Sequence, residues 1–233
     1  MTSPKKIIKK KLKEPDEFVT LTERTYIFIS HHFKPIAGGA VLVLVVISLF
    51  LLYQRWERRN EENAFQMLSA AVETYQRVAS PYREASVQEY KNVLDGFKEV
   101  ATKFPRTSPG KLAILYQGNI NLGLGEFDQA IQAYENFLQQ GGKGRLYRCF
   151  AMEGLGYSYE GKKDYERAIN AFQKEIESGE DFELTNAYLG LGRCYEKLGK
   201  AKEAVENYRT FMKMSKKSEM KNIVLGKISG LEK

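Results

Sequence analysis

Residues 188–208 read YLGLGRCYEKLGKAKEAVENY, and three residues in this stretch decide the fold. Gly192 is followed by Ala204 twelve residues later and by Tyr208 after four more. The spacing of twelve and four residues occurs twice more upstream, in Gly118, Ala130 and Tyr134 and in Gly156, Ala168 and Phe172. The alanines of these three successive copies are 38 and 36 residues apart, which gives the length of a repeated unit.

This spacing predicts hairpins of two closely packed helices. The glycine lets the second helix approach the first, and the alanine lies where the two helices cross. The aromatic side chain fills the gap to the next hairpin. Because each unit must bury its apolar face against a neighbour, repetition at this period predicts an all-α solenoid of stacked hairpins.

The three units resemble tetratricopeptide repeats, whose pattern of about 34 residues combines a Leu-Gly pair, aromatic residues and a central alanine. The resemblance covers residues 111–211. Gln117, Asn121 and Ala201 depart from the pattern. The residues that match it are Ile114, Gly118, Gly125, Phe127, Ala130 and Tyr134; Leu155, Gly156, Tyr159, Tyr165, Ala168 and Phe172; and Tyr188, Leu191, Gly192, Tyr195, Gly199, Ala204 and Tyr208.

Helical periodicity continues on both sides of the repeats. Residues 56–110 are predicted to form a divergent first hairpin, whose opening helix carries a stripe beginning at Phe65 and Leu68. Residues 212–233 are predicted to form a capping helix, which a solenoid needs because its last repeat would otherwise expose its core side. The apolar stripe predicted for the cap consists of Met220, Ile223, Val224, Ile228 and Leu231.

Residues 36–53 contain no charged side chain and are long enough, at about 1.5 Å per residue, to cross a bilayer core. A buried core helix is the weaker alternative, since no other segment could surround so apolar a helix. A cleaved signal peptide would need an n-region of unusual length, and no small-x-small site follows the apolar run. We therefore expect one uncleaved transmembrane helix that contacts the lipid bilayer.

The charges that flank this segment predict its orientation. Residues 1–53 hold eight Lys or Arg and four Asp or Glu, a net charge of +4, and residues 54–233 contribute the remaining +3 of the total of +7. Lysine-rich residues 1–35, with a juxtamembrane helix, are expected on the cytoplasmic side of a bacterial inner membrane, and the C-terminal body in the periplasm. The nearly balanced body gives no reason to expect binding to nucleic acid.

The sequence contains no constellation that would support catalysis. No nucleophile elbow, phosphate loop or zinc-binding His-Glu pair occurs. We therefore expect a binding protein rather than an enzyme, with no cofactor and no metal. Cys149 and Cys194 are expected to be buried and unpaired, because their offset along neighbouring helices exceeds the span of a disulfide.

The resemblance to tetratricopeptide repeats implies a groove that binds proteins or extended peptides, lined by the first helix of each hairpin. The alternative is that these residues pack against one another or against a long helix of the same chain. Only Asn119 fits the set that clamps a C-terminal carboxylate in chaperone-binding members. The implied groove residues are Leu112, Leu115, Asn119 and Leu122; Phe150, Glu153, Tyr157 and Glu160; and Asn186, Leu189, Arg193 and Glu196.

The order of parts is similar to that of the ancillary subunit family of the bacterial SecYEG translocon, including the approach to the apolar segment at residues 34–39. The resemblance implies an anchored scaffold that meets exported proteins or their chaperones. Two alternatives remain open. One is an adaptor in an envelope, division, pilus or secretion assembly, and the other is a receptor of the mitochondrial outer membrane with its repeats in the cytosol.

Overall fold

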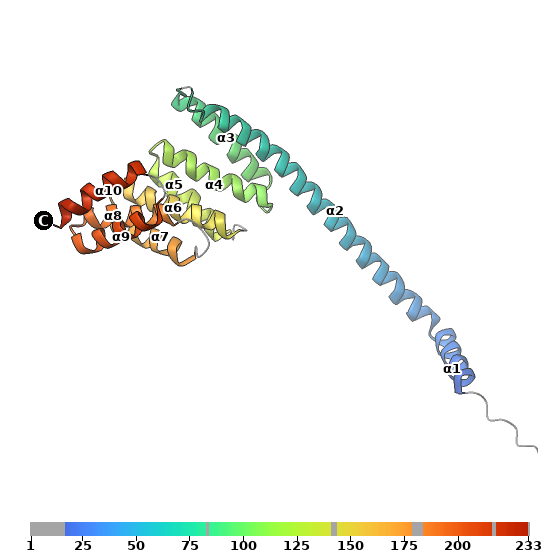
Figure 1. Ribbon diagram of the computed structural model, residues 1–233. Helices are drawn as coiled ribbons and strands as arrows, with labels where there is room; N and C mark the ends of the chain where they lie inside the picture. Colours follow the sequence, from blue (N-terminus) through green and yellow to red (C-terminus); the bar gives the residue numbers. More distant parts are fainter. Residues whose placement is uncertain (1–16, 83, 141–143, 179–183, 216–217, 233) are drawn as a thin grey trace, which may run out of the picture. The chain divides into compact units, whose positions relative to one another are not determined.

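The computed structural model describes residues 17–82, 84–140, 144–178, 184–215 and 218–232. Every regular element in these ranges is an α-helix, which confirms the predicted all-α class. The helices are α1 (Glu17–His31), α2 (Phe33–Val78), α3 (Val87–Lys103), α4 (Ser108–Gly123), α5 (Phe127–Gln139), α6 (Arg145–Gly161), α7 (Tyr165–Ser178), α8 (Thr185–Lys197), α9 (Ala201–Met214) and α10 (Ser218–Leu231). The chain divides into two compact units, residues 1–57 and residues 58–233 (Figure 1).

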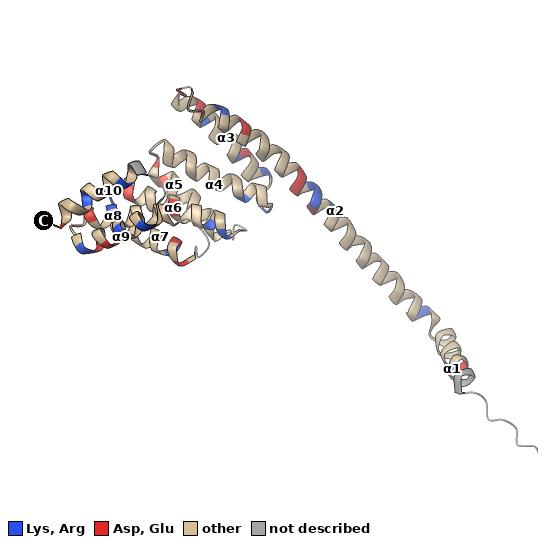
Figure 2. Cartoon of the chain, in the orientation of Figure 1, with Lys and Arg blue, Asp and Glu red and all other residues tan. Residues whose placement is uncertain are grey.

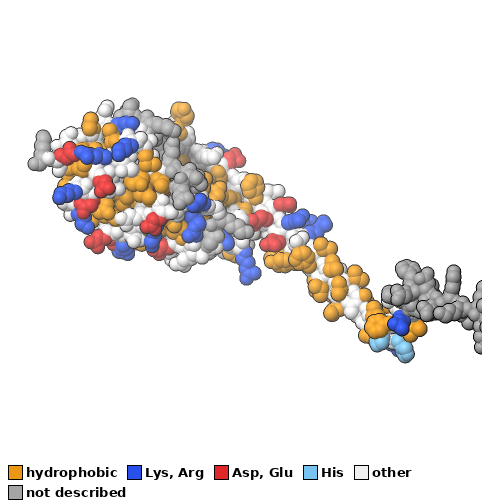
Figure 3. All heavy atoms as spheres, turned by 60° about the horizontal axis from the view of Figure 1, so that its bottom comes forward, with side chains coloured by type: hydrophobic (Ala, Val, Ile, Leu, Met, Phe, Trp, Pro, Cys, Tyr) orange, Lys and Arg blue, Asp and Glu red, His pale blue; other side chains and the backbone are white. Residues whose placement is uncertain are grey.

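The first unit contains α1 and the N-terminal part of α2. Pro35 lies in the first turn of α2, where a missing N–H costs little. No charged residue occurs between Lys34 and Arg55, and Figure 2 shows this length of helix entirely in tan. Hydrophobic side chains cover this part of α2 (Figure 3), and the apolar window has a mean hydropathy of 2.7 with none of it buried. Among the described helices, α2 is the one long and apolar enough to be a candidate membrane span.

The second unit begins with the C-terminal part of α2, which pairs with α3. Leu68 and Val78 of α2 join a buried cluster with Phe97 of α3 and Ala113 of α4. Glu61 accepts a hydrogen bond from the backbone N–H of Ser108 at 3.0 Å, which satisfies a free donor at the start of α4. This part of α2 therefore acts as the first helix of a hairpin.

Three further hairpins follow in chain order: α4 with α5, α6 with α7, and α8 with α9 (Figure 1). Each second helix also packs on the first helix of the next hairpin, so α5 contacts α6 and α7 contacts α8. The first helices contact one another, α4 with α6 and α6 with α8. The three repeated alanines, at positions 130, 168 and 204, are completely buried.

The first two repeated aromatic rings, Tyr134 and Phe172, are each enclosed by two glycines from successive first helices. A Cβ built on Gly118 would lie 2.6 Å from the ring of Tyr134, and one built on Gly154 would lie 2.2 Å from it. Phe172 is held in the same way between Gly156 and Gly190. A Cβ at these glycines would overlap the ring, so the missing side chain sets how closely neighbouring hairpins approach.

The interface between α3 and α4 replaces this arrangement with a stacked pair of rings. Tyr116 stands in α4 where the next repeat has Gly154, and its ring stacks on Phe97 at 4.8 Å with an interplanar angle of 5°. Gln117, which departs from the repeat pattern, donates a hydrogen bond to the Phe97 carbonyl at 3.3 Å. Both departures therefore form the contact with the divergent first hairpin.

The last helix, α10, packs on α9. Val224 and Ile228 are buried against Phe211, and Met220 and Leu231 pack beside them. Ile223 was expected on the same stripe, but that prediction is wrong, because its side chain is 57% exposed. Residues 220, 224, 228 and 231 follow the helical period, and position 223 falls about 100° away from 224 around the helix.

Both cysteines are buried and unpaired, as predicted. Burial raises the pKa of the Cys194 thiol to about 12, so this group is a packing residue rather than a reactive thiolate.

A substitution at Gly154 would test the glycine–aromatic contact. We expect Gly154→Ala to destabilise the full chain by roughly 1–3 kcal/mol, because the new methyl group overlaps the fully buried ring of Tyr134. The thermal midpoint in detergent, followed by circular dichroism, measures this effect.

Gly226→Ala is the matched control, since no atom lies within 4 Å of the new Cβ. Alanine is favoured over glycine inside a helix by about 1 kcal/mol, so this variant should be as stable as the unsubstituted chain or more so. Equal thermal midpoints for the two variants would show that packing of the Tyr134 ring does not require a glycine at position 154.

Candidate functional site

The twelve predicted groove residues lie on α4, α6 and α8, and we call the surface to which they contribute the first-helix surface. Asn119, Phe150 and Asn186 are exposed, whereas Leu115 and Leu189 are core residues. The remaining seven are partly buried: Leu112, Leu122, Glu153, Tyr157, Glu160, Arg193 and Glu196.

Polar side chains on this surface pair between neighbouring helices. Arg193 of α8 donates to both carboxylate oxygens of Glu160 on α6, at 2.7 and 2.6 Å. The same guanidinium lies 5.6 Å from the centre of the Tyr157 ring. Asn186 donates to Glu153 at 2.9 Å. The charged side chains that α6 and α8 contribute to this surface are therefore largely paired with one another or with polar neighbours in the chain.

The two ends of the surface are also tied internally. The Tyr134 hydroxyl donates to the Asn119 side chain at 2.8 Å. Glu196 accepts hydrogen bonds from Tyr208 at 2.5 Å and from Lys227 of α10 at 2.8 Å. Burial opposes ionisation of Glu196, but these two donors outweigh it and hold its pKa below the usual range. Glu196 therefore joins α8 to the capping helix.

Two apolar side chains outside the predicted groove set are exposed near Phe150, which belongs to that set. Phe65 and Tyr147 are 63% and 38% exposed, and Phe150 is 46% exposed. Phe65, Leu112 and Tyr147 line a hollow of about 200 Å³ between α2, α4 and α6, which we call the Phe65 hollow. The sequence placed Phe65 on the core stripe of its helix. The helical periodicity of the sequence alone does not show that Phe65 is exposed, because its exposure depends on how α2 packs against α4.

A buried carboxyl group lies close to the first-helix surface. Glu175 of α7 is only 5% exposed, and its Oε2 atom has no hydrogen-bond partner. Burial, with a smaller contribution from the charge of Glu153, raises its pKa to about 8. The group is therefore protonated near neutral pH.

A metal site would need several acidic or other metal-ligating side chains close together. No group of three or more His, Cys, Asp or Glu in the described ranges is arranged to hold a metal ion. The carboxylates on α6 and α8 that carry charge are engaged in the pairs above, so what this surface offers is contact area.

A model of the tetratricopeptide repeat-like domain family matches residues 28–233. The chain belongs to this family. The match includes α2 and every helix that follows it, and the fold is one of protein-interaction scaffolds that are generally not enzymes. No curated protein matches the chain.

Solved structures with the same kind of fold include "MamA RS-1 ArsTM double mutant", with a TM-score of 0.53 and 13% sequence identity over 72% of this chain and 94% of that chain. A tetratricopeptide repeat protein from Parabacteroides merdae ATCC 43184 matches with a TM-score of 0.32 and 16% identity, over 76% of this chain and 80% of its own. At this identity, the first similarity supports the fold alone.

The pKa of Glu175 predicts how stability depends on pH. The folded chain holds this proton up to about pH 8, whereas the unfolded chain releases it near the ordinary value of 4.5. Folding is therefore progressively weakened as pH rises from about 5 to 8. We expect Glu175→Gln to reduce this fall, so the variant should gain stability relative to the unsubstituted chain as pH increases.

Thermal midpoints at pH 5, 7 and 9 would measure this effect. Glu177→Gln, an exposed substitution two residues away on the same helix, is the control. Parallel pH profiles for the native chain and Glu175→Gln would exclude a raised pKa.

Proposed function

We propose that this protein is a membrane-anchored scaffold that holds a protein partner on its first-helix surface. The observation that carries the proposal is the exposure of Phe65, Tyr147 and Phe150 on a fold built for protein contacts. Large apolar side chains gathered on a surface favour a protein interface, because covering them removes apolar area from water. The paired charges beside them would affect which partners can bind rather than how tightly they bind.

The candidate span in α2 supports attachment to a membrane. Eight Lys or Arg precede residues 36–53, and Arg55, Arg58 and Arg59 follow closely. This excess favours a cytoplasmic N-terminus and a periplasmic repeat domain in a bacterial inner membrane. Anchoring would raise the local concentration of the scaffold near a protein exit site.

We further propose that the partner belongs to the bacterial Sec translocon or to the exported chains that leave it. The support is the order of parts: a basic segment, one apolar span and a repeat domain. An adaptor in an envelope, division, pilus or secretion assembly uses the same parts. A receptor with its repeats in the cytosol differs from both in topology.

Photo-crosslinking from position 150 would identify the partner. We expect a photoreactive amino acid at Phe150, in the full chain in intact membranes, to crosslink to a Sec channel subunit or to a chain in transit. The same amino acid at Tyr82 is the control, because this residue is 96% exposed in the turn after α2 and lies away from the first-helix surface.

Crosslinks from position 150 to a division or secretion complex would support the adaptor instead. If positions 82 and 150 gave identical crosslinked products, the first-helix surface would not be the surface that binds the partner.

An alkaline phosphatase fusion after Lys233 would test the topology. We expect an active enzyme, because phosphatase folds only outside the cytoplasm, where its disulfides form. A fusion that is inactive but expressed at the same level would place the repeats in the cytosol, and it would favour the receptor.

A further inference from the structure

A second hollow lies on the side of α6 away from the first-helix surface. It has a volume of about 520 Å³ and is lined by residues of α5, α6 and α7. On α6 its lining residues are Arg148, Met152, Leu155 and Tyr159, which follow one face of the helix at spacings of four, three and four. Phe150, Glu153 and Tyr157 occupy another face. The two surfaces could therefore be occupied at the same time.

The floor of this hollow is apolar and its rim is mainly cationic. Leu138, Met152, Leu155 and Ala171 line the floor, and Arg148, Arg167 and Lys174 stand around it with one carboxylate, Glu135. We call it the α5–α7 hollow. Such a lining matches a ligand that carries both acidic and apolar groups.

Two of the three cations have no carboxylate partner in the parts of the chain that the structure describes. Arg148 makes only a long hydrogen bond of 3.4 Å to the Leu138 carbonyl. Lys174 is exposed and forms no ion pair among the described residues. Both can meet an incoming carboxylate without first breaking an existing ion pair.

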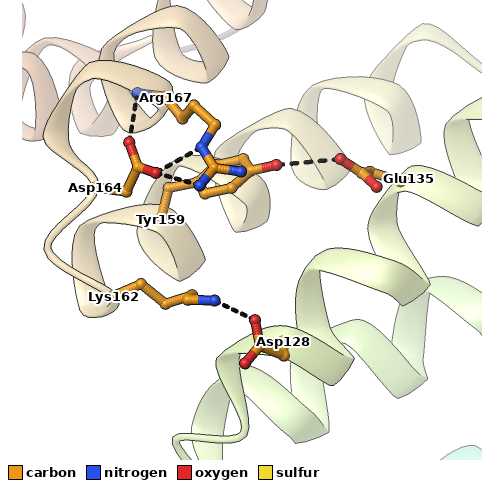
Figure 4. Close-up of polar contacts among 6 residues, drawn as sticks. All are labelled: Asp128, Glu135, Tyr159, Lys162, Asp164 and Arg167. Atoms are coloured by element: carbon orange, nitrogen blue, oxygen red, sulfur yellow. Dashed lines mark hydrogen bonds and ion pairs between the residues drawn. The ribbon is translucent and has the colours of Figure 1, made fainter.

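Three further lining residues, Glu135, Tyr159 and Arg167, are held by contacts with one another and with neighbouring side chains, as Figure 4 shows. The Arg167 guanidinium lies 4.8 Å from the centre of the Tyr159 ring and pairs with Asp164. The Tyr159 hydroxyl donates to Glu135 at 3.1 Å. Lys162 pairs with Asp128 nearby. These contacts fix the wall of the hollow and orient Glu135, whose charge is outnumbered there by those of Arg148, Arg167 and Lys174.

The neighbouring repeats show that the cations are not needed for packing. The positions of Arg148, Arg167 and Lys174 correspond to Leu184, Glu203 and Thr210 one repeat later, and to Gly110, Gln129 and Asn136 one repeat earlier. The contact between Tyr159 and Glu135, in contrast, recurs in the next repeat as Tyr195 with Gln173 at 3.4 Å. The tyrosine contact therefore belongs to the repeat, whereas three cations around one hollow are specific to this interface.

We propose that the α5–α7 hollow binds a short acidic segment of a partner protein in which carboxylates flank an apolar residue. Arg148 and Lys174, which form no ion pair among the described residues, supply the contacts for the two carboxylates. In an extended peptide, side chains at positions i, i+2 and i+4 point to the same side. The matching ligand therefore has acidic residues at positions i and i+4, with leucine at i+2 over the floor.

A peptide titration would test this site directly. The probe is fluorescein-labelled Ser-Gly-Glu-Ser-Leu-Ser-Glu-Gly-Ser, titrated with the full chain in phosphatidylcholine nanodiscs and followed by fluorescence anisotropy. We expect saturable binding that weakens with added salt. The same peptide with both Glu replaced by Gln should bind about tenfold more weakly, because it lacks the charge-assisted contacts.

Two variants of the chain and one control locate the binding. Arg148→Gln combined with Lys174→Gln should weaken binding of the acidic peptide about tenfold or more. Lys213→Gln, an exposed substitution on α9, should leave it unchanged. Met152→Tyr should block the hollow while keeping the fold, because the next repeat carries Tyr188 at the same position. Thermal midpoints would show whether each variant is folded. If Met152→Tyr is not folded, the result for the double variant decides the test.

Three results would overturn the proposal. These are equal binding of the acidic and neutral peptides, native binding by the double variant, or binding of phosphatidylglycerol vesicles in place of the peptide through Arg148 and Lys174. None of them bears on crosslinking from Phe150, so the two proposals fail independently.

Discussion

The close contact of one aromatic ring with two glycines is the interaction on which the stack of hairpins depends. Tyr134 and Phe172 each touch the first helix of their own hairpin and that of the next. Each ring thus packs within its own hairpin and against the first helix of the next one. Burial of a ring removes roughly 150–250 Å² of surface from water. The arrangement ends at both ends of the stack. At the first interface Tyr116 replaces the glycine with a ring that stacks on Phe97, and at the last α10 covers Tyr208.

The features that the sequence predicted correctly are those that depend on local spacing. A glycine, an alanine and an aromatic at fixed distances permit few packings, so the all-α fold and the buried alanines followed from the pattern. The exposure of the groove residues did not follow, because their partners lie on the next repeat. Glu160 is half-buried only because Arg193 reaches it from 33 residues away. Phe65 is exposed for a related reason, since its environment depends on how α2 meets α4 and α6.

The internal pairing of charges limits how the first-helix surface can recognise a partner. Arg193 with Glu160, and Lys227 with Glu196, join successive helices and hold much of the surface neutral. A partner that competed for these groups would have to break bidentate contacts, and the cost of leaving either charge unpaired is high. Affinity would therefore come from the apolar residues around the Phe65 hollow. The paired charges would reject partners whose own charges have no counterpart there.

The repeats also provide a reference within the chain for deciding which departures concern function. Tyr116 departs from glycine, but its stacking on Phe97 explains it as packing. Glu175 is different, since a buried carboxyl without a hydrogen-bond partner for Oε2 costs stability. The cations at 148, 167 and 174 differ again, because their equivalents in the adjoining repeats are mostly uncharged and include one acid. Arg167 contacts Tyr159 and Asp164, but Arg148 and Lys174 have no ion-pair partner among the described residues, and an acidic ligand would give them one.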